Sequence, residues 1–140
     1  MNSAIYTFSK LASQKHYKIV YIQNGYEGLI DEKYIEIDLE QLRKDVYLPG
    51  TVIGSSRSKR FQLSSEDREK GVKALKENLG VRALVILGGN GSYQGGELIS
   101  KLGLPVILLP ATIDNDVYST KYTIGFHSAL EEIGSALYKI

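Results

Sequence analysis

The run Ala83-Leu84-Val85-Ile86-Leu87-Gly88-Gly89-Asn90-Gly91-Ser92 decides the fold of this chain. Its first half is an almost continuous apolar segment, as expected for a parallel strand that is covered on both faces. Its second half is rich in glycine and leads into a segment of helical periodicity at residues 94–102. A strand that passes through a glycine turn into a helix is the repeating unit of open α/β sheets.

The same alternation extends to both sides of this run. A second apolar segment at residues 105–110 predicts the next strand, and residues 18–23 predict an earlier strand that ends at the turn signal Asn24-Gly25. Residues 26–38 read as a polar loop with a short strand near 34–37. Helices are expected over residues 3–15, 39–47, 64–80 and 94–102, and from about residue 125 to the end of the chain.

The helix over residues 64–80 has the clearest boundaries. Ser64 and Asp67 have the spacing of a capping box, Val72, Leu75 and Leu79 form an apolar face, and Gly80 is a typical stop. Together the elements predict an α/β fold with a doubly wound parallel sheet. We expect residues 1–140 to be part of a larger α/β unit, truncated at both ends, because no strand precedes the first helix and the last helix lacks a cap.

The composition limits the classes of function. The chain has 140 residues, 43% of them hydrophobic, and a net charge of +1 with both signs scattered, which gives no electrostatic case for nucleic acid binding. It has no cysteine, and therefore no disulfide framework or thiolate site. No apolar stretch reaches the roughly 20 residues of a membrane span, and the first residues do not resemble a signal peptide. We expect a cytoplasmic protein without membrane or nucleic acid partners.

The glycine turn at residues 88–95 is a candidate phosphate site. Glycines at a strand-to-helix turn let backbone N–H groups approach phosphate oxygens, and the helix N-terminus adds a partial positive charge. Ser92 adds a hydroxyl donor. The alternative is that these glycines only allow a tight turn, and short glycine patterns on their own favour that interpretation.

The run Thr112-Ile113-Asp114-Asn115-Asp116 follows the strand predicted at residues 105–110. On an extended backbone Asp114 and Asp116 would point the same way, so one carboxylate could accept a proton while the other orients a metal-bound phosphate. The alternative is a turn in which these side chains cap backbone groups. Because ligands gather at the carboxyl ends of parallel strands, and the glycine turn lies at the same edge, we favour the functional interpretation.

Arg57 is a further candidate, since a fixed guanidinium near a transferring phosphate stabilises transition-state charge. The alternative is an ordinary solvated arginine in a loop, which the residues alone favour.

Read together, the motifs resemble the 6-phosphofructokinase family over the whole chain. The resemblance rests on four segments that occur in the same order as in the family: Asn24 to Leu29, Gly50 to Arg57, Gly88 to Tyr93, and Pro110 to Asp116. The segment Tyr122-Thr123-Ile124-Gly125-Phe126 extends it. The resemblance implies that residues 1–140 are a partial nucleotide-binding domain of a cytoplasmic, allosterically regulated kinase of glycolysis. Such a kinase uses ATP with Mg²⁺ to phosphorylate fructose 6-phosphate, and the complete protein would be a homotetramer. Gly91 and Ala111 resemble the ATP-dependent rather than the pyrophosphate-dependent branch.

The resemblance also implies roles for individual residues. Asp114 would be the general base for the 1-hydroxyl of the sugar, Thr112 would contact substrate, and Asp116 would support the polar network. Arg57 would stabilise the transferring phosphate and bind nucleotide. The nucleotide would also be held by Tyr26, Gly91, Ser92 and Gly95.

Three departures from the family pattern qualify these expectations. Asn90 stands where the family has an aspartate that helps to hold Mg²⁺, so we expect weak metal binding there. Tyr6 and Leu39 stand at positions of effector-binding arginines, and only Lys10 keeps a positive charge, so regulation of the bacterial kind is not expected. The family's second half, which grips the sugar phosphate, is not part of this sequence.

These departures leave two alternatives beside the kinase. We expect the 140-residue chain alone to be inactive as a kinase. A non-catalytic nucleotide-binding protein is one alternative, slightly favoured by Asn90. The other is the lipid- and NAD-kinase group with its related glycine signature, and the segments at Arg57 and at residues 112–116 weigh against it.

Overall fold

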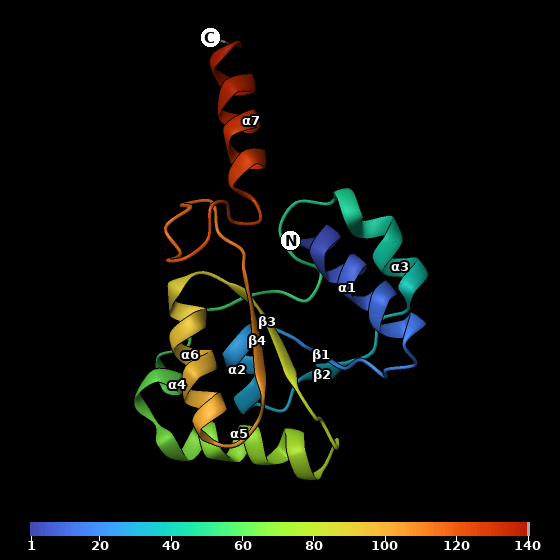
Figure 1. Cartoon of the computed structure of the whole chain (residues 1–140), viewed down its shortest axis with the longest axis vertical. Coiled ribbons are helices and arrows are strands. Elements are labelled where there is room, and N and C mark those ends of the chain that lie inside the picture. The colour runs from blue at the N-terminus through green and yellow to red at the C-terminus, as the bar shows by residue number, and fades with distance from the viewer. Residues whose placement is uncertain (140) are drawn as a thin grey trace.

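The structure is a computed structural model that describes residues 1–139, and its arrangement is visible in Figure 1. In chain order the elements are α1 (Asn2–Gln14), β1 (Tyr21–Ile22), α2 (Gly25–Ile30), β2 (Tyr34–Ile35), α3 (Leu39–Lys44), the 3₁₀ helix η1 (Asp45–Tyr47), α4 (Lys59–Leu63), α5 (Ser65–Glu77), β3 (Leu84–Gly88), α6 (Asn90–Lys101), β4 (Val106–Pro110) and α7 (Phe126–Leu137).

The two strands predicted at residues 83–87 and 105–110 form a parallel pair. β3 and β4 align from Leu84 opposite Val106 to Gly88 opposite Pro110, and an isolated parallel bridge joins Ala111 to Ile124 just beyond β4. Helix α6 connects the two strands and packs on both of them. A Cβ on Gly96 would lie 2.7 Å from the Leu108 side chain, so a glycine lets α6 approach the strands closely. This β–α–β unit confirms the parallel α/β prediction.

The prediction for residues 18–23 is wrong in part. Only Tyr21 and Ile22 form a strand, and β1 pairs antiparallel with β2 as a separate two-stranded sheet in the described chain. The connection between them is short, and a short connection allows an antiparallel return, whereas a parallel pair needs a crossover of a dozen or more residues. The short strand expected near 34–37 is present as β2.

Two helices differ from their predicted bounds. Residues 25–30 form α2, although a loop was predicted over 26–38, because the turn at Asn24 and Gly25 (φ 56° at each) leads directly into a helix. Helix α6 begins at Asn90 rather than near residue 94: Gly88 ends β3, Gly89 is the N-cap, and Gly91 lies in the first turn of the helix. The other predicted helices are present as α1, α3 with η1, α5 and α7. Helix α7 ends at Leu137 rather than running to the end of the chain, and residue 140 of that prediction lies outside the described residues.

Helix α5 confirms its predicted start, and it ends at Glu77, shortly before the glycine predicted as its stop. The Ser64 hydroxyl accepts a hydrogen bond from the Asp67 N–H at 3.1 Å, and Gly80 has a left-handed φ of 62° after the end of the helix. Val72 and Leu75 are buried, as expected, whereas Leu79 lies beyond Glu77 and is 41% exposed. The predicted apolar face therefore ends with the helix.

Two groups of buried side chains hold these elements together. The larger lies among α2, α4, α5 and α6 and consists of Leu29, Ile30, Phe61, Val72, Leu75, Ile99 and Leu104. The smaller joins α1, β1 and α3 through Ile5, Tyr21 and Leu42. Buried side chains of both α2 and α6 belong to the larger group, so the loops at the ends of these helices have fixed starting points.

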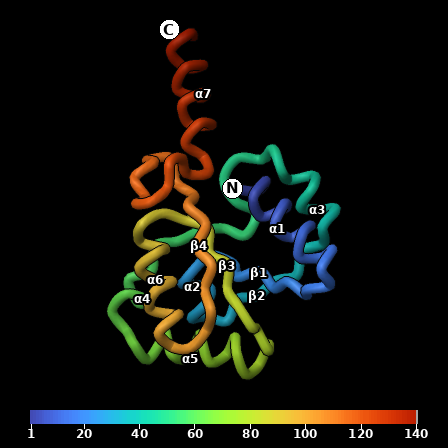
Figure 2. Tube along the Cα trace, viewed as in Figure 1, coloured from blue at the N-terminus to red at the C-terminus, as the bar shows by residue number. Residues whose placement is uncertain are grey.

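Helix α7 stands apart from the rest of the fold, projecting from it in Figures 1 and 2. None of its residues, Phe126 to Leu137, is buried. The predicted apolar positions Ile133 and Leu137 are 57% and 67% exposed. As for membranes, no helix among residues 1–139 is both long enough and apolar enough to span a bilayer.

Candidate functional site

The N-terminus of α6 provides the anion-binding feature of the site. Gly89 caps the helix, and its carbonyl accepts hydrogen bonds from the N–H groups of Ser92 (3.0 Å) and Tyr93 (3.1 Å). The first N–H groups of the helix, those of Asn90 and Gly91, have no intrahelical acceptor, and the N-cap Gly89 has no side chain that could accept their hydrogen bonds. Such N–H groups and the helix dipole together attract phosphate.

The glycines of this turn separate into two kinds. A side chain on Gly88 would overlap the Ser92 side chain, and a Cβ on Gly95 would lie 2.5 Å from ring carbons of Tyr26, so packing requires glycine at both positions. Gly91 is different. It is exposed, and a Cβ built on it meets no described atom within 4 Å. The tight-turn alternative thus explains Gly88 and Gly95, whereas packing gives no reason for glycine at Gly91.

The acidic run follows β4, at the same edge of the sheet as the glycine turn. Ala111 donates its N–H to the Gly88 carbonyl at 3.0 Å, which joins the two loops directly. The Thr112 hydroxyl accepts a hydrogen bond from the Asp114 N–H (3.2 Å) and lies 3.4 Å from Asp114 Oδ2 as its donor. The Asp114 carboxylate is therefore oriented by Thr112 while it stays exposed.

The assumption of an extended backbone through this run is wrong. Asn115 has a left-handed φ of 52°, so Asp114 and Asp116 are not related by strand alternation. Asn115 instead braces the loop, since its amide accepts a hydrogen bond from the Thr123 N–H (2.9 Å) and donates one to the Lys121 carbonyl (3.2 Å). The backbone-capping alternative is thus confirmed for Asn115.

Thr123 is a structural contributor that the sequence analysis did not single out. Its side chain is almost fully buried, and its hydroxyl donates to the Thr112 carbonyl at 2.6 Å. It thereby fixes the residue that orients Asp114. The sequence contains no local signal for this role, because the contact spans 11 residues of irregular chain.

Asn90 and Asp116 form the second direct link between the two loops. The Asn90 amide nitrogen lies 3.0 Å from Asp116 Oδ2 and donates a hydrogen bond to it. The Asp116 carboxylate thus faces the first turn of α6, and a neutral donor already occupies one of its oxygens. Among residues 1–139 no three histidine, cysteine, aspartate or glutamate side chains gather as a metal-binding group.

Arg57 lies on an exposed loop directly before α4. Within the described part of the chain it forms no ion pair, and no hydrogen bond joins it to Asp114 or Asp116. The following Ser58 caps α4 by accepting a hydrogen bond from the Phe61 N–H at 3.0 Å. The guanidinium is therefore available to a ligand, and its position depends on the backbone to either side.

Tyr26 is held inside the fold. Its ring stacks on that of Phe61, with centroids 4.1 Å apart and planes 12° from parallel, and its hydroxyl donates to the Ser92 carbonyl at 2.5 Å. Burial raises the pKa of Tyr26 well above its usual range, so the hydroxyl remains a donor. Tyr26 thus connects α2 to the first turn of α6 through its hydroxyl.

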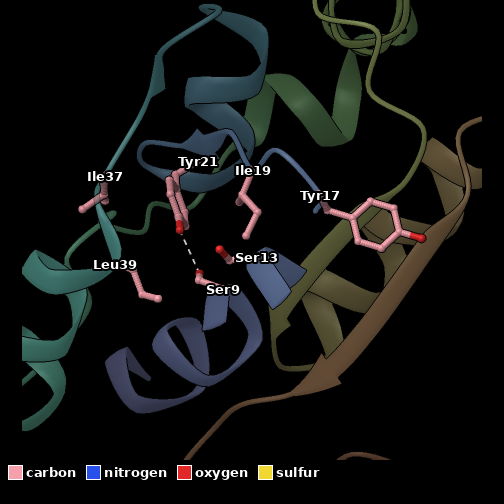
Figure 3. A pocket seen from close by; sticks show the side chains of 7 residues that line it. All are labelled: Ser9, Ser13, Tyr17, Ile19, Tyr21, Ile37 and Leu39. Carbon is pink, nitrogen blue, oxygen red and sulfur yellow. Dashed lines mark hydrogen bonds between the residues drawn. The ribbon is translucent and has the colours of Figure 1, made fainter. Parts of the chain in front are cut away.

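A separate hollow lies between α1 and the start of α3, far from the glycine turn in the sequence (Figure 3). The Tyr21 hydroxyl donates to Ser9 Oγ at 2.8 Å there, and the Tyr17 ring points away. Its lining has hydroxyl and aliphatic groups but no charged side chain: Ser9, Ser13, Tyr17, Ile19, Tyr21, Ile37 and Leu39. This lining gives an anion no charged partner, and it contains no residue proposed for the phosphate site.

Known proteins are similar to this chain in both sequence and fold. The family model described as Phosphofructokinase matches residues 1–140. The chain belongs to the phosphofructokinase family. A probable ATP-dependent 6-phosphofructokinase of Malacoplasma penetrans is 40% identical over 140 residues, and one of Mycoplasma genitalium is 45% identical over 133 residues. The sequence resemblance is thereby confirmed.

Solved phosphofructokinase structures confirm the fold. The structure from Saccharomyces cerevisiae matches with a TM-score of 0.87 at 28% identity, covering 99% of this chain and 22% of that one. The Pichia pastoris enzyme matches with a TM-score of 0.85 at 27% identity, covering 98% and 16%. The chain covers 43% and 41% of the two bacterial relatives. It therefore corresponds to less than half of a phosphofructokinase of that kind.

Proposed function

We propose that this chain is the nucleotide-binding part of an ATP-dependent 6-phosphofructokinase, which transfers the γ-phosphoryl group of ATP to fructose 6-phosphate in glycolysis. The single observation that carries the proposal is the α6 N-terminus, where Gly91 has no packing constraint and the first N–H groups lack an intrahelical acceptor. The names of the bacterial relatives support ATP as the donor.

In this proposal, the residues at the sheet edge have three different roles. The N–H groups of Asn90 and Gly91 and the Ser92 hydroxyl bind nucleotide phosphates. Asp114, oriented by Thr112, accepts the proton of the sugar 1-hydroxyl while the hydroxyl oxygen bonds to the γ-phosphorus. The bond from the γ-phosphorus to the ADP oxygen breaks, and Arg57 stabilises the charge that develops on the transferring group.

Mg²⁺ is expected in an ATP-dependent kinase, and the residues of this chain can be compared with its needs. Mg²⁺ prefers an octahedral set of hard oxygen donors, in proteins often one or two carboxylates with substrate phosphates. Here the Asp116 carboxylate is paired with the neutral Asn90 amide, and residues 1–139 offer no cluster of three acidic or histidine groups. The residues do not fit a resident Mg²⁺ site. We propose that the ion arrives as a complex with ATP and is held by the phosphates.

The proposal is tested by ATP binding to the purified 140-residue chain, measured by isothermal titration calorimetry. Gly91→Ala should leave the melting temperature unchanged or higher, because alanine favours a helix by about 1 kcal/mol over glycine. It should also weaken ATP binding about tenfold or more, because the new methyl group occupies the phosphate approach.

Gly134→Ala is the matched control. Gly134 is also a helical glycine whose added Cβ would meet no described atom within 4 Å, but it lies in α7. It should leave ATP affinity unchanged, and because α7 has no buried residue it should also leave the melting temperature of the domain unchanged. If wild-type chain binds no ATP, or if both variants bind ATP equally well, the α6 N-terminus is not the phosphate site.

A non-catalytic nucleotide-binding protein is the second candidate, favoured by the Asn90 amide at Asp116. Both candidates bind ATP, and phosphoryl transfer separates them. We expect the 140-residue chain to turn over negligible fructose 6-phosphate, because it spans less than half of its bacterial relatives. A chain extended to the full length of those relatives should be active if the kinase proposal holds. An inactive but ATP-binding full-length protein would favour the second candidate.

A further inference from the structure

The position of Arg57 depends on how its loop is held, since its side chain is exposed and forms no ion pair among residues 1–139. The helix that follows, α4, has only five residues, Lys59 to Leu63. A helix this short is not stable by itself, because isolated helices below about 12 residues are marginal in water. Contacts with other elements must therefore fix α4, and with it the backbone next to Arg57.

Two arginines supply directional contacts to α4: Arg68 of α5 donates to the Phe61 and Gln62 carbonyls at 2.6 and 3.0 Å, and Arg60 joins α4 to α2. The Arg60 Nη2 lies 2.6 Å from Glu27 Oε2 and 2.6 Å from Asp31 Oδ1, and its Nε lies 3.1 Å from Glu27 Oε2. Glu27 and Asp31 lie in and directly after α2, one helical turn apart. A planar guanidinium that engages two carboxylates is fixed in orientation as well as in position. Arg60 thus joins α4 to α2 with a defined geometry.

The ion pairs of Arg60 orient α4 relative to α2 more than they contribute to the free energy of unfolding. The Arg60 side chain is 48% exposed and its partners about a third, and exposed ion pairs contribute little to the free energy of unfolding. Hydrogen bonding from the Ser58 hydroxyl and from Arg60 lowers the pKa of Glu27, and Arg60 lowers the pKa of Asp31. Both carboxyls therefore remain ionised and bound at neutral pH.

The loop before Arg57 is attached to the same helix. The Ser56 hydroxyl donates to the Asn24 carbonyl at 2.7 Å, and the Asn24 N–H donates to the Ile53 carbonyl at 2.9 Å. Asn24 is the N-cap of α2. The chain on both sides of Arg57 therefore contacts α2. Before Arg57 the contact is to Asn24, and after it Arg60 binds the carboxylates of Glu27 and Asp31.

Helix α2 also contacts the phosphate site directly. The Tyr26 ring stacks on Phe61 of α4, and its hydroxyl donates to the Ser92 carbonyl in the first turn of α6. A continuous series of contacts therefore runs from Arg57 through α4 and α2 to the helix end that receives phosphates. These contacts connect the backbone beside Arg57 to the first turn of α6.

We propose that Arg60 is a positioning residue that, by bridging Glu27 and Asp31, holds Arg57 in place for the terminal phosphate of ATP. This inference rests on the proposed function, because it needs Arg57 to contact that phosphate. Arg60 itself does not touch the nucleotide in this proposal. Its effect on binding passes entirely through Arg57.

The dependence of Arg60 on Arg57 can be tested in the 140-residue chain. ATP, ADP and AMP affinities are measured by calorimetry for wild type, Arg57→Ala, Arg60→Ala and the double variant. Arg57→Ala should weaken ATP about tenfold or more, as loss of a charge-assisted hydrogen bond does, and should leave AMP unchanged. Arg60→Ala should weaken ATP roughly threefold to tenfold, again without affecting AMP. In the Arg57→Ala background, Arg60→Ala should have no further effect, because the two residues act as one unit.

Two further variants separate positioning from general damage. Arg60→Lys should give an intermediate ATP affinity, because an ammonium lacks the planar fork that engages both carboxylates. Lys101→Ala is the control, since it removes another exposed ion pair, the 2.7 Å contact to Glu97, at the other end of α6. It should change no affinity.

The outcomes distinguish this inference from the proposed function. The positioning role would be overturned if Arg60→Ala weakened ATP binding equally in the wild-type and Arg57→Ala backgrounds. It would also be overturned if Arg60→Ala weakened ATP and AMP binding equally. In both cases the proposed ATP binding would stand. An Arg57→Ala chain that binds ATP like wild type would also overturn the positioning role. No ATP binding by wild type would overturn both proposals together.

Discussion

The ring of Tyr26 occupies the space that a side chain on Gly95 would need, with ring carbons 2.5 Å from an added Cβ. Tyr26 comes from α2 and Gly95 from the second turn of α6, so this contact sets how closely the two helices approach. The ring cannot easily move aside, because Phe61 stacks on its face and the hydroxyl is bound to the Ser92 carbonyl.

Gly95→Ala should therefore destabilise the fold. Although alanine favours helices, the overlap with a fixed ring should dominate and lower the free energy of unfolding by about 1–3 kcal/mol. Urea unfolding followed by circular dichroism measures the change. Gly91→Ala in the same helix serves as the control and should not be destabilised, since its added Cβ meets no described atom. Equal stability of the two variants would contradict the close contact.

Tyr26→Phe tests the hydroxyl alone. The ring stack stays, while the hydrogen bond to the Ser92 carbonyl is lost, so we expect a loss of about 1 kcal/mol in unfolding free energy. Tyr34→Phe is a matched control, because the Tyr34 hydroxyl is buried without a hydrogen-bond partner among the described residues, and its removal should be neutral or stabilising. The resemblance assigns Tyr26 to nucleotide binding. A large loss of ATP affinity in Tyr26→Phe would support direct contact over a packing role.

Asn90→Asp tests the missing metal ligand. The substitution places a second carboxylate beside Asp116, where the wild-type amide donates a hydrogen bond at 3.0 Å. Two adjacent carboxylates repel each other and favour a divalent cation. We expect Mg²⁺ to raise the melting temperature of Asn90→Asp more than that of wild type. In a protein extended to the full length of the bacterial relatives, the same substitution should lower the Mg²⁺ concentration needed for activity. Asn78→Asp, after α5, is the control. An identical response to Mg²⁺ in all three chains would show that residue 90 is not at the metal.

The Arg60 contacts should respond to acid. The pKa of Glu27 lies below its ordinary value of 4.5 through the Ser58 hydroxyl and Arg60, and that of Asp31 lies below 3.8 through Arg60 and Lys33. Because the folded state binds these protons less readily than the unfolded state, the contacts stabilise the fold above the ordinary values and are lost as the pH falls through the lowered ones. The stability difference between wild type and Arg60→Ala should be constant from pH 7 to about 5 and shrink below about pH 4. A difference that does not vary down to pH 3 would contradict the ion pairing.

Much of the parallel unit could be predicted because its signals are local. The apolar runs that became β3 and β4 are continuous, as buried parallel strands require, and Ser64 and Gly80 mark the start and stop of α5 without help from other parts of the chain. The order and spacing of the four motifs were specific enough to indicate the family from the sequence alone. The strand and helix predictions needed only neighbouring residues, whereas the family prediction needed the order of motifs along the chain.

The errors occurred where distant contacts override local preference. The glycine run has poor helix propensity, yet α6 begins at Asn90, because Gly95 and Gly96 bring the helix against Tyr26 and Leu108. Asn115 adopts a left-handed conformation that its contacts with Lys121 and Thr123 stabilise. Neither contact is visible in the sequence, so the start of the helix and the directions of the two carboxylates could not be predicted.

Helix α7 differs from every other long helix of the described chain in that packing does not hold it, since none of its residues is buried. A 12-residue helix with no buried residue opens at little cost in free energy. Its backbone amides in the 140-residue chain should therefore exchange with deuterium within seconds, while those of β3, β4 and α5 exchange only when the whole domain unfolds. Slow exchange along α7 would then report that another surface has covered it.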